Sequence, residues 1–196
     1  MPAGTVPNNT HSLIVHEQGR SAAAEAYRRL RMNIQYAEPN ERLRIIMITS
    51  SLSGEGKSVT AANVAAALAQ AGYKTVIADC DLRQPAQHLI FGRVADGLTN
   101  VLARERPLAA VLQATEVKNL TLLASGPRPD NPAAMLTAPA MDKVVGYLAV
   151  RYDYVIVDTP PVLVVPDSCR LAFRADGIVM VLGAGTARAG EVRLAR

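Results

Sequence analysis

The chain has 196 residues, of which 49% are apolar and 19% are charged, so one folded domain with a sizeable core is expected and wholesale disorder is not. Its 21 basic and 17 acidic residues give a net charge of +4, which suits anionic ligands or an acidic membrane surface but is no proof of nucleic-acid binding. With two Phe and no Trp it lacks a stacking platform for nucleic acid, and two cysteines are too few for a disulfide scaffold or a Cys-based zinc site.

The first residues of the chain are polar and contain several prolines and glycines, which predicts a flexible arm over residues 1–21. They lack the basic start and apolar run of a signal peptide, and no stretch of 18 apolar residues occurs in the chain. We therefore expect a cytoplasmic protein that reaches the inner face of a membrane only through a partner.

A helix is expected next, over residues 22–38. Apolar side chains recur at helical spacing on one face of it, at Ala23, Tyr27, Leu30 and Ile34. Glu25, Arg28 and Arg31 lie on its flank. Taken alone, such a charged flank is typical of a solvated helix face, where each ion pair contributes about 0.3 kcal/mol.

The rest of the chain alternates apolar strands with helices. Strands are expected at residues 44–49, 75–79, 120–124, 154–158 and 177–182, and helices at 58–71, 139–150 and 167–174, with short helices between 85 and 113 and a polar loop at 125–132. Strands that are apolar throughout are typical of a sheet covered on both faces. The pattern predicts a three-layer α/β sandwich with a mostly parallel central sheet, in one domain over residues 22–196.

The segment SSLSGEGKS, residues 50–58, joins the first strand to the following helix. A glycine-rich turn that leads into a helix directs backbone N–H groups at a bound phosphate. Lys57 would reach the β- and γ-phosphates, and the Ser58 hydroxyl would bind Mg²⁺. Position 51, where the P-loop pattern has its first glycine, is Ser51, yet the strand–loop–helix setting favours a phosphate site over a simple turn with a surface lysine.

Acidic residues mark the ends of two other strands. Asp79 and Asp81 follow the second strand, and Asp158 ends the fourth in the manner of a Walker B aspartate. A single aspartate at such a place is as often a helix cap or a turn residue. Because open parallel sheets bind ligands beyond the carboxyl ends of their strands, three of them beside a P-loop predict a site for a nucleoside triphosphate with Mg²⁺.

Three segments, SSLSGEGKS, VIADCDLRQP and YDYVIVDTPPV, resemble the Walker A, A′ and B motifs of bacterial tyrosine kinases of the CpsD/CapB type. The likeness spans about residues 22–187 and includes EAYRRLR at residues 25–31, which is similar to the oligomerisation helix of that family. Related division and partitioning ATPases, the deviant-Walker group, carry a signature lysine five residues before the P-loop lysine. This chain has Leu52 there, which favours the kinase family.

The resemblance implies a P-loop kinase that uses ATP and Mg²⁺ to phosphorylate tyrosines, its own included, in capsule or exopolysaccharide synthesis and export. It implies that Asp79 accepts the tyrosine proton. The implied catalytic residues are Lys57, Asp79 and Asp81, the nucleotide-binding residues Ser53, Gly54, Glu55, Gly56, Lys57, Ser58 and Val59, and the metal ligands Ser58, Asp81 and Asp158.

The resemblance also implies partners. These are a membrane-bound activator of the chain-length-determinant type, protein tyrosine substrates, and further copies of the chain in a ring joined through Glu25, Arg28 and Arg31. Family members continue through another helix, a strand near the adenine and a tyrosine-rich tail, so the C-terminal part of the domain is expected to be missing here. Two alternatives stay open, namely a ParA/MinD-like ATPase switch and a nucleotide-binding regulatory subunit without kinase output.

Overall fold

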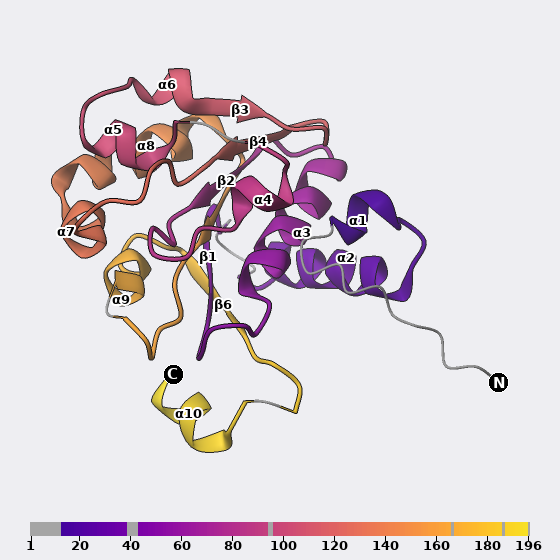
Figure 1. Ribbon diagram of the computed structural model, residues 1–196. Helices are drawn as coiled ribbons and strands as arrows, with labels where there is room; N and C mark the ends of the chain where they lie inside the picture. The colour runs from indigo at the N-terminus through magenta and orange to yellow at the C-terminus, as the bar shows by residue number, and fades with distance from the viewer. Residues whose placement is uncertain (1–12, 39–42, 94–95, 166, 186, 196) are drawn as a thin grey trace.

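The computed structural model describes residues 13–38, 43–93, 96–165, 167–185 and 187–195, which form a six-stranded sheet between two helix layers (Figure 1). The strands are β1 (Ile45–Ser50), β2 (Thr75–Asp79), β3 (Leu112–Ala114), β4 (Leu120–Leu123), β5 (Tyr154–Asp158) and β6 (Gly177–Val181), in the order β3-β4-β2-β5-β1-β6. All neighbours pair in parallel except β3 and β4. The predicted three-layer α/β fold with a mostly parallel sheet is confirmed.

The helices divide between the two faces of the sheet. One face carries α1 (Ile14–Glu17), α2 (Ala22–Gln35), α3 (Lys57–Gln70) and α4 (Gln87–Ile90); the other carries α5 (Leu98–Leu102), α6 (Leu108–Val111), α7 (Pro132–Thr137), α8 (Pro139–Arg151) and α9 (Asp167–Ala172). A last helix, α10 (Ala189–Leu194), lies beyond the end of β6 (Figure 1). In the described part of the chain no helix is long and apolar enough to span a membrane.

Strict alternation along the central strands fills both cores. In β1, Ile46 and Ile48 pack under α2 and α3 while Met47 packs on the opposite side of the sheet. The same alternation occurs in β5, where Ile156 and its neighbour Val157 enter different cores. A strand with a period of two and both faces covered must be apolar at every position, which is why these strands read as unbroken apolar runs.

The N-terminal arm is the main correction to the expected organisation. Residues 1–12 of the arm lie outside the described residues, but from Leu13 onward the chain forms α1 and packs on α3. Leu13 and Val15 are buried, and the Val15 N–H donates a hydrogen bond to Asn63 Oδ1 at 2.9 Å. Three consecutive apolar residues, LIV, give this stretch enough surface to bury, although prolines and polar residues surround it.

Several element predictions need smaller corrections. On α2 the buried alanine is Ala24 and not Ala23, which is exposed, because the face of α2 that packs inward carries Ala24 and Ile34. The edge strand β3 and the helix α7 were also not expected. Both are short, three and six residues, so neither shows a full hydrophobic period in the sequence.

Candidate active site

The P-loop occupies the turn between β1 and α3. Gly54 and Gly56 have φ values of +84° and +88°, a left-handed conformation that favours glycine, and Gly56 is the N-cap of α3. Ser51 does not have a positive φ, so the backbone makes no demand for glycine there. Its hydroxyl instead donates to Glu55 Oε2 at 2.8 Å, which explains how the departure from the usual pattern is accommodated.

The Glu55 side chain stabilises this loop through hydrogen bonds to backbone N–H groups. Its Oε2 accepts the Leu52 N–H at 2.8 Å, and its Oε1 accepts the N–H of Gly183, just after β6, at 3.1 Å. Desolvation acts to raise the pKa of Glu55, but the hydrogen bonds from Leu52, Gly183 and Ser51 outweigh it and leave the pKa lowered. The Glu55 carboxylate therefore holds the loop, and its backbone N–H is the group left to meet a phosphate.

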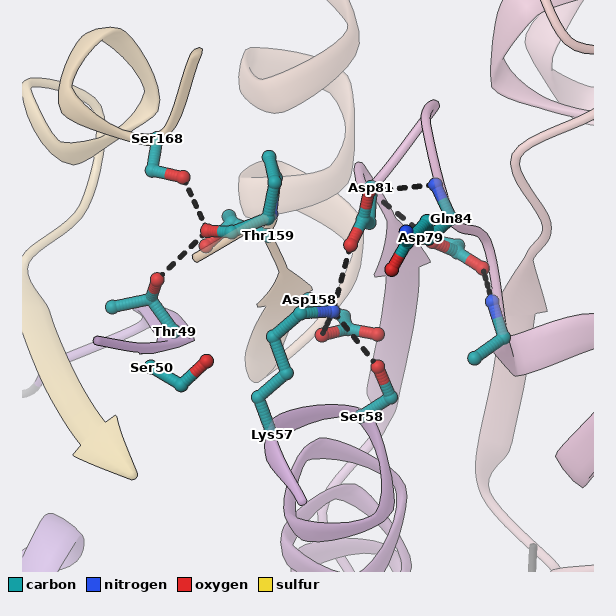
Figure 2. A network of polar contacts seen from close by, with 12 residues as sticks. Thr49, Ser50, Lys57, Ser58, Asp79, Asp81, Gln84, Asp158, Thr159 and Ser168 are labelled. Carbon is teal, nitrogen blue, oxygen red and sulfur yellow. Dashed lines mark hydrogen bonds and ion pairs between the residues drawn. The ribbon is translucent and has the colours of Figure 1, made fainter. Parts of the chain in front are cut away.

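Lys57 lies at the centre of the charged cluster in Figure 2. Its Nζ is 2.8 Å from Asp81 Oδ2 and 3.6 Å from Asp158 Oδ1, and it donates to Ser58 Oγ at 3.0 Å. Desolvation acts to lower the pKa of Lys57, yet the charges of Asp158 and Asp81 outweigh it and raise the pKa. The Lys57 side chain thus stays a buried cation at neutral pH, and it lies at the N-terminus of α3.

Asp79 is tied to the backbone that follows it. Its Oδ2 accepts the N–H groups of Ala86 and Gln87 at 3.0 and 2.9 Å, and its Oδ1 accepts the Asp81 N–H at 3.2 Å. Burial, and then the charge of Asp158, raise the pKa of Asp79 to about 8. Burial and the neighbouring carboxylate thus favour the neutral form of Asp79, and its oxygens organise residues 80–87.

Asp158 faces Asp79 across the β2–β5 pair and is fully buried. Its Oδ2 accepts from Gln87 Nε2 at 2.7 Å, whereas its Oδ1 has no hydrogen-bond donor. Burial raises the pKa of Asp158, against the opposing effects of Lys57, of the Gln87 hydrogen bond and of the neighbouring Ser58 hydroxyl. Asp81 completes the cluster, and its Oδ1 accepts the Gln84 N–H at 2.9 Å.

A pocket of about 620 Å³ opens on Lys57 and Ser58, whereas Asp79, Asp81 and Asp158 are not among its lining residues. Residues 53–60 line it together with Tyr27, Gln84, Ala86 and Ile90, so every predicted nucleotide-binding residue borders the same space. The volume is in the range of small-ligand pockets. Tyr27 was expected only as a core residue of α2, and sequence periodicity carries no signal that it also reaches the pocket.

The predicted metal ligands fit Mg²⁺ only together with a nucleotide. Among the described residues, no three His, Cys, Asp or Glu side chains converge as a self-sufficient metal site. Asp158 Oδ1 is nevertheless a buried oxygen without a donor, near Lys57 and the Ser58 hydroxyl. Mg²⁺ commonly binds one or two protein oxygens and completes its shell with phosphates and waters, so the oxygens present suit it.

The predicted oligomerisation residues lie apart from this cluster. Arg28 pairs with Glu25 on the surface of α2, and none of Glu25, Arg28 and Arg31 lines the P-loop pocket. The Nε of Arg31 is buried and has no hydrogen-bond partner.

Comparison with known proteins agrees with this geometry. A sequence profile of the AAA domain family matches residues 43–190. The chain is 41% identical over 175 residues to the tyrosine-protein kinase YwqD of Bacillus subtilis, covering 89% of this chain and 74% of YwqD. The chain belongs to the bacterial tyrosine-protein kinases. Its fold also superimposes on the chimerical protein CapA2B2 with a TM-score of 0.90 at 40% identity, over 93% of this chain and 81% of that one.

The kinase family is structurally nearer to this chain than the division ATPases are. The septum site-determining protein MinD of Pyrococcus horikoshii, solved with Mg-ADP, is 26% identical, with a TM-score of 0.62 over 70% of this chain and 57% of that one. The chain is thus a tyrosine kinase on a P-loop fold, and that fold implies nucleotide binding.

Proposed function

We propose that this kinase transfers the terminal phosphoryl group of ATP to tyrosine hydroxyls, on itself and on other proteins, during capsule or exopolysaccharide synthesis and export. The observation that carries the proposal is the convergence of Lys57, Ser58 and three buried aspartates beside a glycine loop. Phosphoryl transfer depends chiefly on positioning and on neutralising charge, which such a cluster provides.

The roles follow from the positions of the side chains. Backbone N–H groups of residues 53–59 bind phosphate oxygens, and Lys57 turns from Asp81 to neutralise them. Ser58, Asp81 and Asp158 hold Mg²⁺, which when bound supplies further positive charge against the phosphates. One buried lysine faces three aspartates, so a nucleotide without a divalent cation would add negative charge to an already acidic cluster.

Asp79 is the proposed proton acceptor for the tyrosine hydroxyl. With a pKa of about 8 the carboxyl favours its neutral form in the free protein, so the proposal requires that Asp79 be ionised in the complex, where Lys57 and a bound Mg²⁺ would favour the carboxylate. Because Asp79 is completely buried and bonded to the backbone of residues 81, 86 and 87, a substrate reaches it only after residues 80–87 shift.

We also propose a membrane-bound chain-length-determinant protein as activator, whose cytoplasmic tail would keep the kinase at the inner face of the membrane. The CapA2B2 neighbour supports this, since a chimera joins parts of two proteins. We also propose ring-like self-association through Glu25, Arg28 and Arg31, which lie on α2 and leave the P-loop pocket free.

The test is incubation with γ-labelled ATP and Mg²⁺, with and without an activator tail, with phosphotyrosine as the readout. Lys57→Met should lower phosphotyrosine by about 100-fold or more, because it removes the only buried lysine among the described residues of the cluster. Lys118→Met is the matched control, since Lys118 is exposed and remote from the pocket. Thermal melting of each variant separates lost chemistry from lost folding.

Other outcomes would replace the proposal. Hydrolysis of ATP without phosphotyrosine would indicate the ATPase-switch function that the likeness to MinD suggests. Nucleotide binding without any turnover would indicate a regulatory subunit.

A further inference from the structure

Gln87 connects the parts of the active site that are far apart in the sequence. It opens α4 and is completely buried. Its Nε2 donates to Asp158 Oδ2 at 2.7 Å and to the Ser58 carbonyl oxygen at 3.0 Å. Its backbone N–H donates to Asp79 Oδ2 at 2.9 Å. One residue thus contacts the end of β2, the end of β5 and the first turn of α3.

The chemistry of its neighbours fixes which way the Gln87 amide faces. Both groups around Nε2 are acceptors, a carboxylate and a carbonyl. A reversed amide would place its oxygen against both of them and lose both hydrogen bonds, so the observed orientation is the stable one.

In this orientation of the Gln87 amide, the two oxygens of Asp158 have different surroundings. Oδ2 is held by the amide, while Oδ1 is left without a donor, 3.6 Å from Lys57 Nζ. The hydrogen bond from Gln87 sets the plane of the Asp158 carboxylate, so that one of its two equivalent oxygens faces Lys57. The neutral amide of Gln87 orients the Asp158 carboxylate without adding charge. Asp79 and Asp158 are buried side by side, so an added charge there would be costly.

We propose that Gln87 is a positioning residue that presents Asp158 Oδ1, together with Ser58, to the Mg²⁺ of the bound nucleotide. This inference rests on the proposed function. The Gln87 Oε1, buried and without a partner, is a further acceptor available for a water of the hydrated ion. Partners that orient metal ligands in this way are commonly worth tenfold or more in metal affinity.

The test is a titration of Mg²⁺ into the full chain with a fluorescent ATP analogue, which reads binding and not turnover. Gln87→Met keeps the length of the side chain and removes the amide. It should raise the Mg²⁺ concentration for half-maximal enhancement of nucleotide binding by about 10-fold or more, while affinity in EDTA changes by less than about twofold. Leu89→Met, on the exposed side of the same short helix, should match the wild type in both measurements.

A double-mutant cycle tests whether Gln87 acts through Asp158. In an Asp158→Asn background, Gln87→Met should have little further effect on the Mg²⁺ titration, because the group that it positions is already altered. If Gln87→Met fails to fold in a melting experiment, Gln87→Asn takes its place, since its amide is one methylene too short to reach both acceptors.

The outcomes separate this inference from the proposed function. If the wild type shows no Mg²⁺-dependent nucleotide binding, both are wrong. If the wild type responds to Mg²⁺ and the Gln87 variants follow the same titration, only the role of Gln87 is wrong. Equal losses with Mg²⁺ and in EDTA would also overturn it, because they would indicate general damage to the pocket.

Discussion

At the scale of single residues, the charge of one lysine in the active site is opposed by the charges of several buried carboxyl groups. Lys57 is the one cation within ion-pair distance of Asp81 and Asp158 among the described residues, and Asp79 is buried next to them. Burial raises the pKa of both Asp79 and Asp158, and neighbouring carboxylates act in the same direction, so the environment disfavours a full negative charge on the pair. Stability and pH are therefore linked through these carboxyl groups.

Asp79 should make the nucleotide-free protein less stable as the pH rises. Its pKa is about 8 when folded and near 3.8 when unfolded, so between these values the folded state holds the extra proton. The free energy of unfolding then falls with pH, by up to about 1.4 kcal/mol per unit from this group. Asp79→Asn stays neutral, and urea unfolding at pH 5.5 and pH 8 should show a smaller loss for it than for the wild type.

Asp130→Asn is the control for that experiment, because Asp130 is exposed. An Asp79→Asn variant that loses as much stability with pH as the wild type would contradict the raised pKa.

At the scale of elements, backbone contacts between loops explain what periodicity alone misses. Gly97 precedes α5 and lies against the end of β4, where the Leu98 N–H donates to the Ala124 carbonyl oxygen at 2.8 Å. A Cβ on Gly97 would lie 2.2 Å from that oxygen and 2.4 Å from the Gly126 nitrogen. This glycine is needed for close approach of two backbones and not for a left-handed φ.

Gly97→Ala should therefore destabilise the protein by about 3 kcal/mol, because neither backbone can move without breaking the junction of α5 with β4. Gly146→Ala is the matched control inside α8, where a Cβ meets no atom within 4 Å. It should stabilise the protein by about 0.5–1 kcal/mol through helix propensity. Urea unfolding of both variants measures the contrast, and equal effects would refute the close-approach explanation.

At the scale of the whole molecule, the edge of the sheet formed by β6 borders exposed apolar surface. Beside the edge strand β6, a groove of about 640 Å³ lies between α9, β6 and α10, with a largely apolar lining. Phe173 is 92% exposed and Leu194 is 79% exposed at its border. Contiguous apolar surface of this kind favours association and dye binding.

Phe173→Ser should lower the fluorescence of a bound hydrophobic dye by about twofold and leave nucleotide affinity unchanged, because Phe173 borders the groove and not the P-loop pocket. Val150→Ser is the control, since Val150 is 82% exposed on α8 but does not line the groove. If both substitutions lowered the signal equally, the groove would not be the site of dye binding.

The sequence by itself determined the strands other than β3, the P-loop turn and the acidic strand ends, because each leaves a local signature: an apolar run, a glycine pair, or an aspartate after a strand. Only the tertiary structure decided which side chains face one another. Asp79 and Asp158 are 79 residues apart in position along the chain, and Gln87 meets Asp158 only because β2 and β5 are neighbours. The packing of α1 on α3 and the position of Tyr27 in the wall of the P-loop pocket likewise depend on contacts between distant elements, which no local pattern encodes.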